Sequence, residues 1–259
     1  MPFFKFQSIN IQYKTEGSGE AVVLLHGFLE NQSMWDVIAL ELSKSHKVIR
    51  LDFPGFGNSE TFEDSYSIEN LAHLTHELIK EVKVDKYSLI GHSMGGYVAT
   101  EICKLFPNEI EQLILFHSTA KSDSVSKKKD RDRAVKAVNN KQRIYLKTAI
   151  PFLFPKQYQI SCSKYIQKMI LEAEGLKAKG ISAAISAMKN RNDNSEIVKS
   201  LNCKKTYIAG RWDPLLKIAD LKEEAINNRA QFIEIENAGH MSHWESPSVV
   251  IQELKKIIA

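Results

Sequence analysis

The alternation of apolar and polar positions along the chain predicts strands of two kinds. Near the start, Phe3–Phe6 and Ile9–Tyr13 alternate between apolar and polar residues, which is typical of paired strands at the edge of a sheet. After a turn that contains Gly and Ser, Ala21–Leu25 is apolar throughout, and such a run is typical of a strand buried on both faces of a parallel sheet. Further short runs predict strands at residues 48–51, 87–90, 113–116, 205–209 and 232–235.

Helical spacing of apolar residues fills most of the intervals between these strands. Strands that alternate with helices predict a doubly wound, mostly parallel α/β sheet with helices on both faces. The predicted helices are Ser33–Ser43, Ile68–Val82, Met94–Phe106, Ile218–Asn228 and Pro247–Ile258.

The alternation stops after His117. Residues 119–199 contain only helical patterns rich in Lys, Ala, Ile and Met, and strands resume at residue 205. We therefore expect one α/β core made of residues 1–118 and 200–259, with residues 119–199 as a helical insertion after the sixth strand. Because open α/β sheets bind ligands at the carboxyl ends of their strands, we expect this insertion to cover that edge as a lid.

Composition narrows the class of protein. The 259 residues are 43% apolar and 25% charged, close to the average for soluble globular proteins. The apolar runs fall far below the ~18 residues of a membrane-spanning helix, and the N-terminal sequence lacks the features of a signal peptide. Three scattered cysteines without a CxxC pair fit a reducing compartment. We expect a cytoplasmic protein, monomeric or homodimeric, with no membrane insertion and no bound metal.

The net charge of +4 is unevenly distributed. Residues 121–147 contain ten Lys or Arg against three Asp, a charge of +7, so the rest of the chain carries −3. Our first interpretation is a solvated helical face; the second is attraction of an anionic substrate. Nucleic acid is not expected as a partner, because the basic segment is not interleaved with aromatic residues.

One short motif carries most of the predicted chemistry. Gly91-His92-Ser93-Met94-Gly95 matches G-x-S-x-G between a predicted strand and a predicted helix, which is the context that this motif requires. A serine on so tight a turn has strained backbone angles, and the neighbouring glycines remove clashes that side chains would cause. The turn also places Ser93 at the positive end of a helix, which favours developing negative charge. We predict that Ser93 is a nucleophile.

A serine hydroxyl needs a base, and the base needs an orienting acid. His240 follows the last predicted strand and Asp213 follows the strand before it, so both are expected at the same sheet edge as Ser93. We predict His240 as the base and Asp213 as the acid, an order along the chain that differs from those of other serine-hydrolase folds. The residues leave two rivals open, which are His243 for the base and Asp123 for the acid.

The segment Leu25-His26-Gly27-Phe28 follows the first buried strand. Its backbone is expected to offer the amide of Phe28 opposite Ser93, where it would form an oxyanion hole with the amide of Met94. His26 is interpreted mainly as a hydrogen-bonded organiser of this loop. For the substrate pocket we predict His26, Phe28, Met94 and Phe154, with Phe152 and Leu153 beside them.

LHGF, DFPGFGNS, GHSMGG, GRWDP and NAGHMSHWESP occur in the order and rough spacing of the α/β-hydrolase fold family. The chain resembles the small cytoplasmic bacterial esterase and thioesterase-like branch of that family, except over residues 119–199. The resemblance implies an eight-stranded, mostly parallel sheet with a helical lid. By motif match it implies Ser93 as nucleophile, Asp213 as acid, His240 as base, and the amides of Phe28 and Met94 as oxyanion hole. Haloalkane dehalogenases and epoxide hydrolases of this fold have Asp at the position of Ser93.

The expected function is that of a serine hydrolase acting on a small-molecule carboxylic ester or thioester through an acyl-enzyme on Ser93, without a cofactor. Two other classes stay open. One is an elimination of the lyase or synthase kind, in which Ser93 and His240 abstract a proton without an acyl intermediate. The other is a ligand-sensing protein that retains the hydrolase fold.

Overall fold

A single sheet runs through the computed structural model, which describes residues 2–63 and 65–258 and has eight strands in that part of the chain. The outer limits of the expected core, residues 1 and 259, lie outside the described residues. The strands are β1 (Phe3–Phe6), β2 (Ile9–Glu16), β3 (Ala21–Leu25), β4 (Lys47–Leu51), β5 (Tyr87–His92), β6 (Ile110–Phe116), β7 (Lys204–Gly210) and β8 (Gln231–Ile235).

The sheet order is β1-β2-β4-β3-β5-β6-β7-β8. Strand β2 pairs antiparallel with β1 and with β4, and all pairs from β4 to β8 are parallel. The predicted α/β sheet, mostly parallel and eight-stranded, is thus confirmed. Because β3 and β5 to β8 run in the same direction, the loops that follow them meet at one edge.

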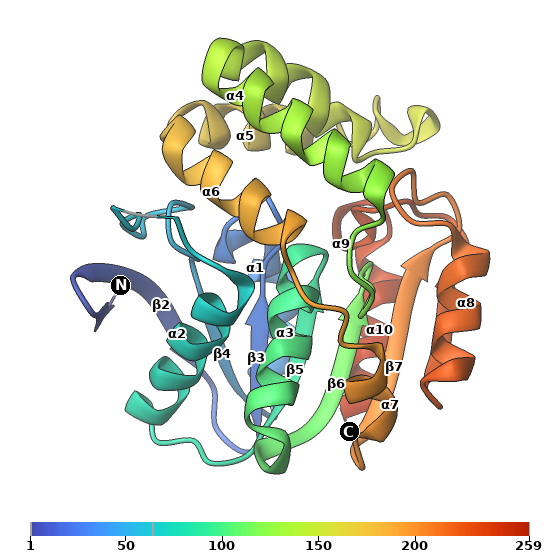
Figure 1. Ribbon diagram of the computed structural model, residues 1–259. Helices are drawn as coiled ribbons and strands as arrows, with labels where there is room; N and C mark the ends of the chain where they lie inside the picture. The colour runs from blue at the N-terminus through green and yellow to red at the C-terminus, as the bar shows by residue number, and fades with distance from the viewer. Residues whose placement is uncertain (1, 64, 259) are drawn as a thin grey trace.

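Helices cover both faces of the sheet (Figure 1). One face carries α1 (Asp36–Leu42) and α10 (Pro247–Ile258), and the other carries α2 (Ile68–Glu81), α3 (Met94–Leu105) and α8 (Ile218–Asn227). All five helices lie where apolar periodicity predicts them, within three residues at each end. The predicted start at Ser33 differs most, because a 3₁₀ turn precedes α1.

The apolar run of β3 shows why both faces are covered. Val22 and Leu24 pack in the cluster that contains Trp35 and faces α1 and α10, whereas Val23 and Leu25 pack in the larger cluster on the opposite face. Successive side chains of a strand point to opposite faces, so an unbroken apolar run buries side chains on both. At an exposed fraction of 0 to 1%, these four residues are fully buried.

Residues 119–199, all of which are described, form four helices and no strand. Helices α4 (Val125–Phe152), α5 (Ser163–Glu174) and α6 (Ala178–Lys189) form a layer beyond the carboxyl ends of the strands, and α7 (Ser195–Ser200) returns to pack beside α3 (Figure 1). Within residues 2–63 and 65–258, no helix combines the length and hydropathy that crossing a bilayer requires.

Candidate active site

Ser93 lies on a sharp turn between β5 and α3. Its φ of 50° and ψ of −112° are strained for a residue with a side chain, and its amide donates to the Phe116 carbonyl at 3.0 Å. A Cβ on Gly91 would lie 2.4 Å from the Gly95 carbonyl oxygen, and one on Gly95 would lie 2.3 Å from the Leu25 carbonyl oxygen. Both glycines are therefore needed to pack the turn against its surroundings, as the motif predicts.

Asp213 and His240 lie together at the same sheet edge, after β7 and β8. His240 Nδ1 lies 2.8 Å from Asp213 Oδ2, and the second carboxylate oxygen accepts the amides of Leu215 and Leu216 at 2.8 and 3.1 Å. Burial raises the pKa of Asp213, but the neighbouring His240 and His117 rings outweigh it and hold this pKa well below its ordinary value. Asp213 is thus a carboxylate that fixes the proton of His240 on Nδ1.

A neutral ring with its proton on Nδ1 leaves Nε2 able to accept a proton. Ser93 and His240 line the same cavity. No protein atom among the described residues, Ser93 Oγ included, forms a hydrogen bond with His240 Nε2. In structures without substrate, catalytic hydrogen bonds are often long and tighten when substrate binds.

The two rivals from the sequence have other partners. Asp123 Oδ1 accepts Arg191 Nη1 at 2.7 Å and Asp123 Oδ2 accepts Arg131 Nε at 3.1 Å, so its carboxylate is used by two arginines. Burial lowers the pKa of His243 to about 4, and its Nε2 lies 3.5 Å from Glu30 Oε1. Among the described residues, neither of these side chains forms a hydrogen bond or ion pair with Asp213 or His240.

The loop after β3 approaches the serine from the other side. Gly27 donates its amide to Glu30 Oε2 at 2.8 Å. His26 donates from Nδ1 to the Gly27 carbonyl at 2.8 Å and accepts the Phe53 amide at Nε2 at 2.9 Å, so the ring is neutral; burial lowers the pKa of His26 accordingly. Phe28 follows this fixed glycine and lines the cavity.

Met94 is the first residue of α3, so its amide is one of those that a helix leaves without an intrahelical partner. Its side chain is buried in the core and does not line the cavity. The two amides expected to form an oxyanion hole therefore belong to a loop that side chains fix and to the start of a buried helix.

The cavity has a volume of about 760 Å³. Its apolar wall residues come both from residues 119–199 (Tyr145, Ala149, Phe152, Leu153 and Met188) and from the rest of the chain (Phe28, Leu29, Tyr97, Leu215, Leu216, Leu221 and Met241). Its charged wall residues are of both signs, with Lys121, Lys127, Arg131, Arg191 and Lys217 against Glu30, Asp123, Asp220, Glu223 and Glu224. The expected pocket residues His26 and Phe154 are buried elsewhere: His26 lies within its loop, and the Phe154 ring stacks on Trp244 with centroids 6.3 Å apart.

Three side chains near the serine were not identified from the sequence, and they are His117, His92 and Glu30. His117 donates from Nδ1 to Asp213 Oδ2 at 3.0 Å and accepts Ser242 Oγ at Nε2 at 2.7 Å; burial lowers the pKa of His117 to about 3. The sequence signal that could have identified His117 is its position directly after the sixth strand, because that position lies at the same edge of the sheet as Ser93.

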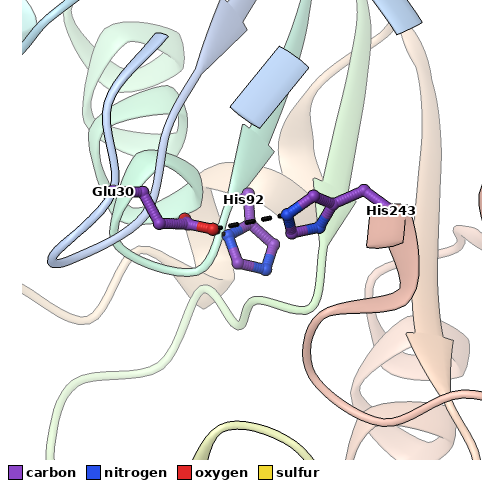
Figure 2. A group of neighbouring side chains, drawn as sticks. All are labelled: Glu30, His92 and His243. Carbon is purple, nitrogen blue, oxygen red and sulfur yellow. Dashed lines mark hydrogen bonds and ion pairs between the residues drawn. The ribbon is translucent and has the colours of Figure 1, made fainter. Parts of the chain in front are cut away.

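His92, the second residue of the G-x-S-x-G motif, forms a buried cluster with Glu30 and His243 (Figure 2). This cluster and the group of His117, Asp213 and His240 each bring three metal-ligand atoms within 4.8 Å. In the second group the Nδ1 atoms of the two histidines already donate to one carboxylate oxygen, so these two nitrogens are not available to an ion.

Comparisons with known proteins identify the family of this fold. Residues 20–247 match the alpha/beta hydrolase fold family. A pimeloyl-[acyl-carrier protein] methyl ester esterase from Pseudoalteromonas atlantica is 37% identical over 112 residues, which are 43% of this chain and 42% of that protein. The aligned part thus spans less than half the length of that relative.

Solved structures match over nearly the whole chain. An esterase from Thermogutta terrifontis has a TM-score of 0.91 at 27% identity, with 96% of this chain and 93% of the other covered. An enol-lactonase from Burkholderia xenovorans has a TM-score of 0.91 at 21% identity, with 99% of each chain covered, and shows likeness of fold. Since the family match extends over residues 20–247 of 259, the chain belongs to the alpha/beta hydrolase fold family.

Proposed function

We propose that this protein is a serine hydrolase that cleaves carboxylic esters or thioesters of small to medium acyl groups. The observation that carries the proposal is the shared cavity of Ser93 and His240, with His240 Nδ1 2.8 Å from the Asp213 carboxylate. The esterase relatives support the same class of substrate.

In the first half of the reaction, Ser93 Oγ attacks the carbonyl carbon while His240 Nε2 takes the hydroxyl proton. Asp213 stabilises the imidazolium that forms, because its buried carboxylate already accepts the Nδ1 proton. The tetrahedral intermediate carries its negative charge on the former carbonyl oxygen, which the amides of Phe28 and Met94 bind. The imidazolium then gives its proton to the leaving alcohol or thiol as the bond to the acyl carbon breaks.

In the second half, His240 takes a proton from water, and the hydroxide equivalent attacks the Ser93 acyl ester. The intermediate collapses with return of the proton to Ser93 Oγ, and the carboxylic acid leaves. Removal of one oxyanion donor costs about 3 kcal/mol in comparable sites. The loop that holds Phe28 therefore contributes on the order of 100-fold to the rate.

We assign the role of lid to the insertion, residues 119–199, because it supplies much of the cavity wall. The aromatic and aliphatic part of that wall favours an acyl chain, and Lys121 and Lys127, which form no salt bridge among the described residues, favour a substrate that also carries negative charge. A comparison of turnover between neutral esters and monoesters of dicarboxylic acids of equal chain length separates the contribution of the apolar wall from that of the basic side chains.

The test measures turnover of p-nitrophenyl esters of increasing acyl length by the wild type and by Ser93→Ala. We expect turnover to fall about a million-fold in the variant, and the preferred length reports the size of the pocket. Ser45→Ala, at an exposed serine before β4, is the matched control and is expected to retain wild-type rates. Turnover that persists in Ser93→Ala, or none by the wild type on any ester, would overturn the proposal.

A further inference from the structure

A buried ion pair lies directly behind the proposed nucleophile. The side chains of Glu30 and His92 are each only 1% exposed, and His92 Nδ1 lies 2.7 Å from Glu30 Oε2. The mechanism above uses neither of them. Figure 2 shows the Glu30 carboxylate facing both His92 and His243, with each of the three coming from a different segment of the chain.

The hydrogen bonds fix the charges of this pair. His92 Nε2 lies 3.0 Å from the carbonyl oxygen of His240, which only accepts. Since Nδ1 faces a carboxylate and Nε2 faces a carbonyl, both nitrogens carry protons and the ring is an imidazolium. Burial lowers the pKa of His92, but the Glu30 carboxylate, the His240 carbonyl and Asp213 together raise it, and the net pKa is above its ordinary value.

Through these bonds the pair touches all three loops of the proposed site. Glu30 Oε2 also accepts the Gly27 amide at 2.8 Å, which fixes the loop that presents the Phe28 amide. His92 immediately precedes Ser93 in the chain. Its Nε2 holds the backbone of His240, the proposed base.

The same atoms do not favour a metal ion here. Glu30 Oε2 already accepts two hydrogen bonds and both nitrogens of His92 donate. His243 faces Glu30 Oε1 at 3.5 Å as a neutral ring, so it adds a dipole beside the carboxylate without a second positive charge.

We propose that Glu30 and His92 are positioning residues that hold the oxyanion-hole loop and the His240 loop in register around Ser93. The inference rests on the proposed function for its kinetic consequences. A buried ion pair contributes little net stability compared with apolar residues, whereas loss of one partner leaves an unpaired buried group. The pair therefore acts on the geometry of the site, where a displacement of about 1 Å can cost about 100-fold in rate.

The test is a double-mutant cycle of Glu30→Gln, His92→Asn and the double variant. Each single variant is expected to lower kcat roughly 10- to 100-fold while KM changes less than about threefold, because both side chains are only 1% exposed where they border the cavity. The double variant is expected to be no slower than the slower single variant, since both remove one interaction. Glu109→Gln breaks a His–Glu pair of similar type, His76 with Glu109 at 3.1 Å, and is expected to leave kcat within twofold.

A second measurement on the wild type does not depend on turnover. In ¹⁵N-histidine NMR at pH 8, both nitrogens of His92 are expected to be protonated. Three carboxylates near this ring favour its charge, and they are Glu30, Asp213 and Glu245 when ionised. Four rings oppose its charge when they are themselves charged: His240, His243 and His117 at 5.0, 5.1 and 5.7 Å, and His26.

Three results would overturn the positioning role: kcat within twofold of wild type in both single variants, losses that multiply in the double variant, or a His92 ring with one protonated nitrogen at pH 8. If a variant fails to fold, the spectrum of the wild type still decides. Failure of the wild type to hydrolyse any ester would overturn the proposed function alone. In that case, the spectrum and the labelling rate of Ser93 by a fluorophosphonate decide whether the pair positions the site.

Discussion

Substitution of Asp213 by Asn tests the proposed acid most directly. The Asp213 carboxylate accepts four hydrogen bonds: Oδ2 from His240 and His117, and Oδ1 from the amides of Leu215 and Leu216. An Asn side chain has one acceptor oxygen and one NH₂ group that only donates. In either orientation its NH₂ group faces two donors, so two of the four hydrogen bonds are lost.

The expected effects of Asp213→Asn on rate and stability follow from the loss of these two hydrogen bonds. If the amide oxygen keeps the backbone amides, His240 faces a donor and its proton moves from Nδ1 to Nε2, the nitrogen that must act as base. A change of this kind costs about 10⁴-fold in kcat, or about 5.5 kcal/mol of transition-state stabilisation. Two lost hydrogen bonds to a charged group, at about 1.5–3 kcal/mol each, also lower the free energy of unfolding by about 3–6 kcal/mol.

The assay compares kcat for a p-nitrophenyl ester with urea unfolding of the same preparations. Asp123→Asn is the matched control, because its carboxylate bonds Arg131 and Arg191 instead of a histidine. We expect that variant to lose stability while its kcat stays within about tenfold of wild type. A folded Asp213→Asn protein with kcat within tenfold of wild type, or a 10⁴-fold loss in Asp123→Asn, would refute the reasoning.

Two further predictions concern the backbone of the site. Gly95→Ala places a Cβ 2.3 Å from the Leu25 carbonyl oxygen and is expected to destabilise the protein by about 1–3 kcal/mol or more in urea unfolding. Gly175→Ala, whose nearest contact is 3.4 Å, should change stability by less than about 1 kcal/mol, and equal effects of the two would contradict the argument. Burial raises the pKa of Glu245 to about 7, so its protonated form stabilises the folded state fully below about pH 4.5 and this stability is lost as pH rises to about 7. Glu245→Gln should reduce this pH-dependent loss in the free energy of unfolding by up to about 3 kcal/mol. A pH dependence of stability equal to that of the wild type would contradict the argument.

The elements of the fold could be predicted because each depends on a local pattern. The run Ala21–Leu25 predicts a doubly buried strand, and β3 is buried on both faces. The ends of a strand are harder to predict from the sequence where polar residues continue the strand. Strand β6 begins at Ile110, three residues before the apolar run, and β2 extends to Glu16 because it pairs with Val48 of β4.

The candidate site could be predicted only as far as strand ends reveal it. Ser93, Asp213 and His240 each follow a predicted strand, and parallel strands bring such positions to one edge. The partners of Asp123 could not be predicted, because Arg131 comes from α4 and Arg191 from the segment after α6. Contacts between distant segments depend on side-chain direction, which no local periodicity encodes.

The same limit explains Phe154. Residues 152 and 154 are both phenylalanines, and both lie near the end of α4. The helix ends at Phe152, which lines the cavity, and the chain then turns so that the Phe154 ring stacks on Trp244. Two residues of separation across a helix end place the two rings in different surroundings.

The hydrogen-bond partners of the five histidines near Ser93 distinguish the roles of these residues, which motif spacing alone does not. His26 donates with one nitrogen and accepts with the other, His117 does the same, and both nitrogens of His92 donate. His243 is buried against Glu30 and does not line the cavity. Within the described residues, His240 alone of the five combines a fixed Nδ1 proton with an Nε2 that has no protein partner in a ring that lines the cavity beside Ser93. A general base needs one nitrogen held in the right tautomer and the other exposed to the nucleophile. Three of the four neighbouring rings have both nitrogens hydrogen-bonded elsewhere, and the fourth, His243, does not line the cavity, so His240 is the ring that meets both needs.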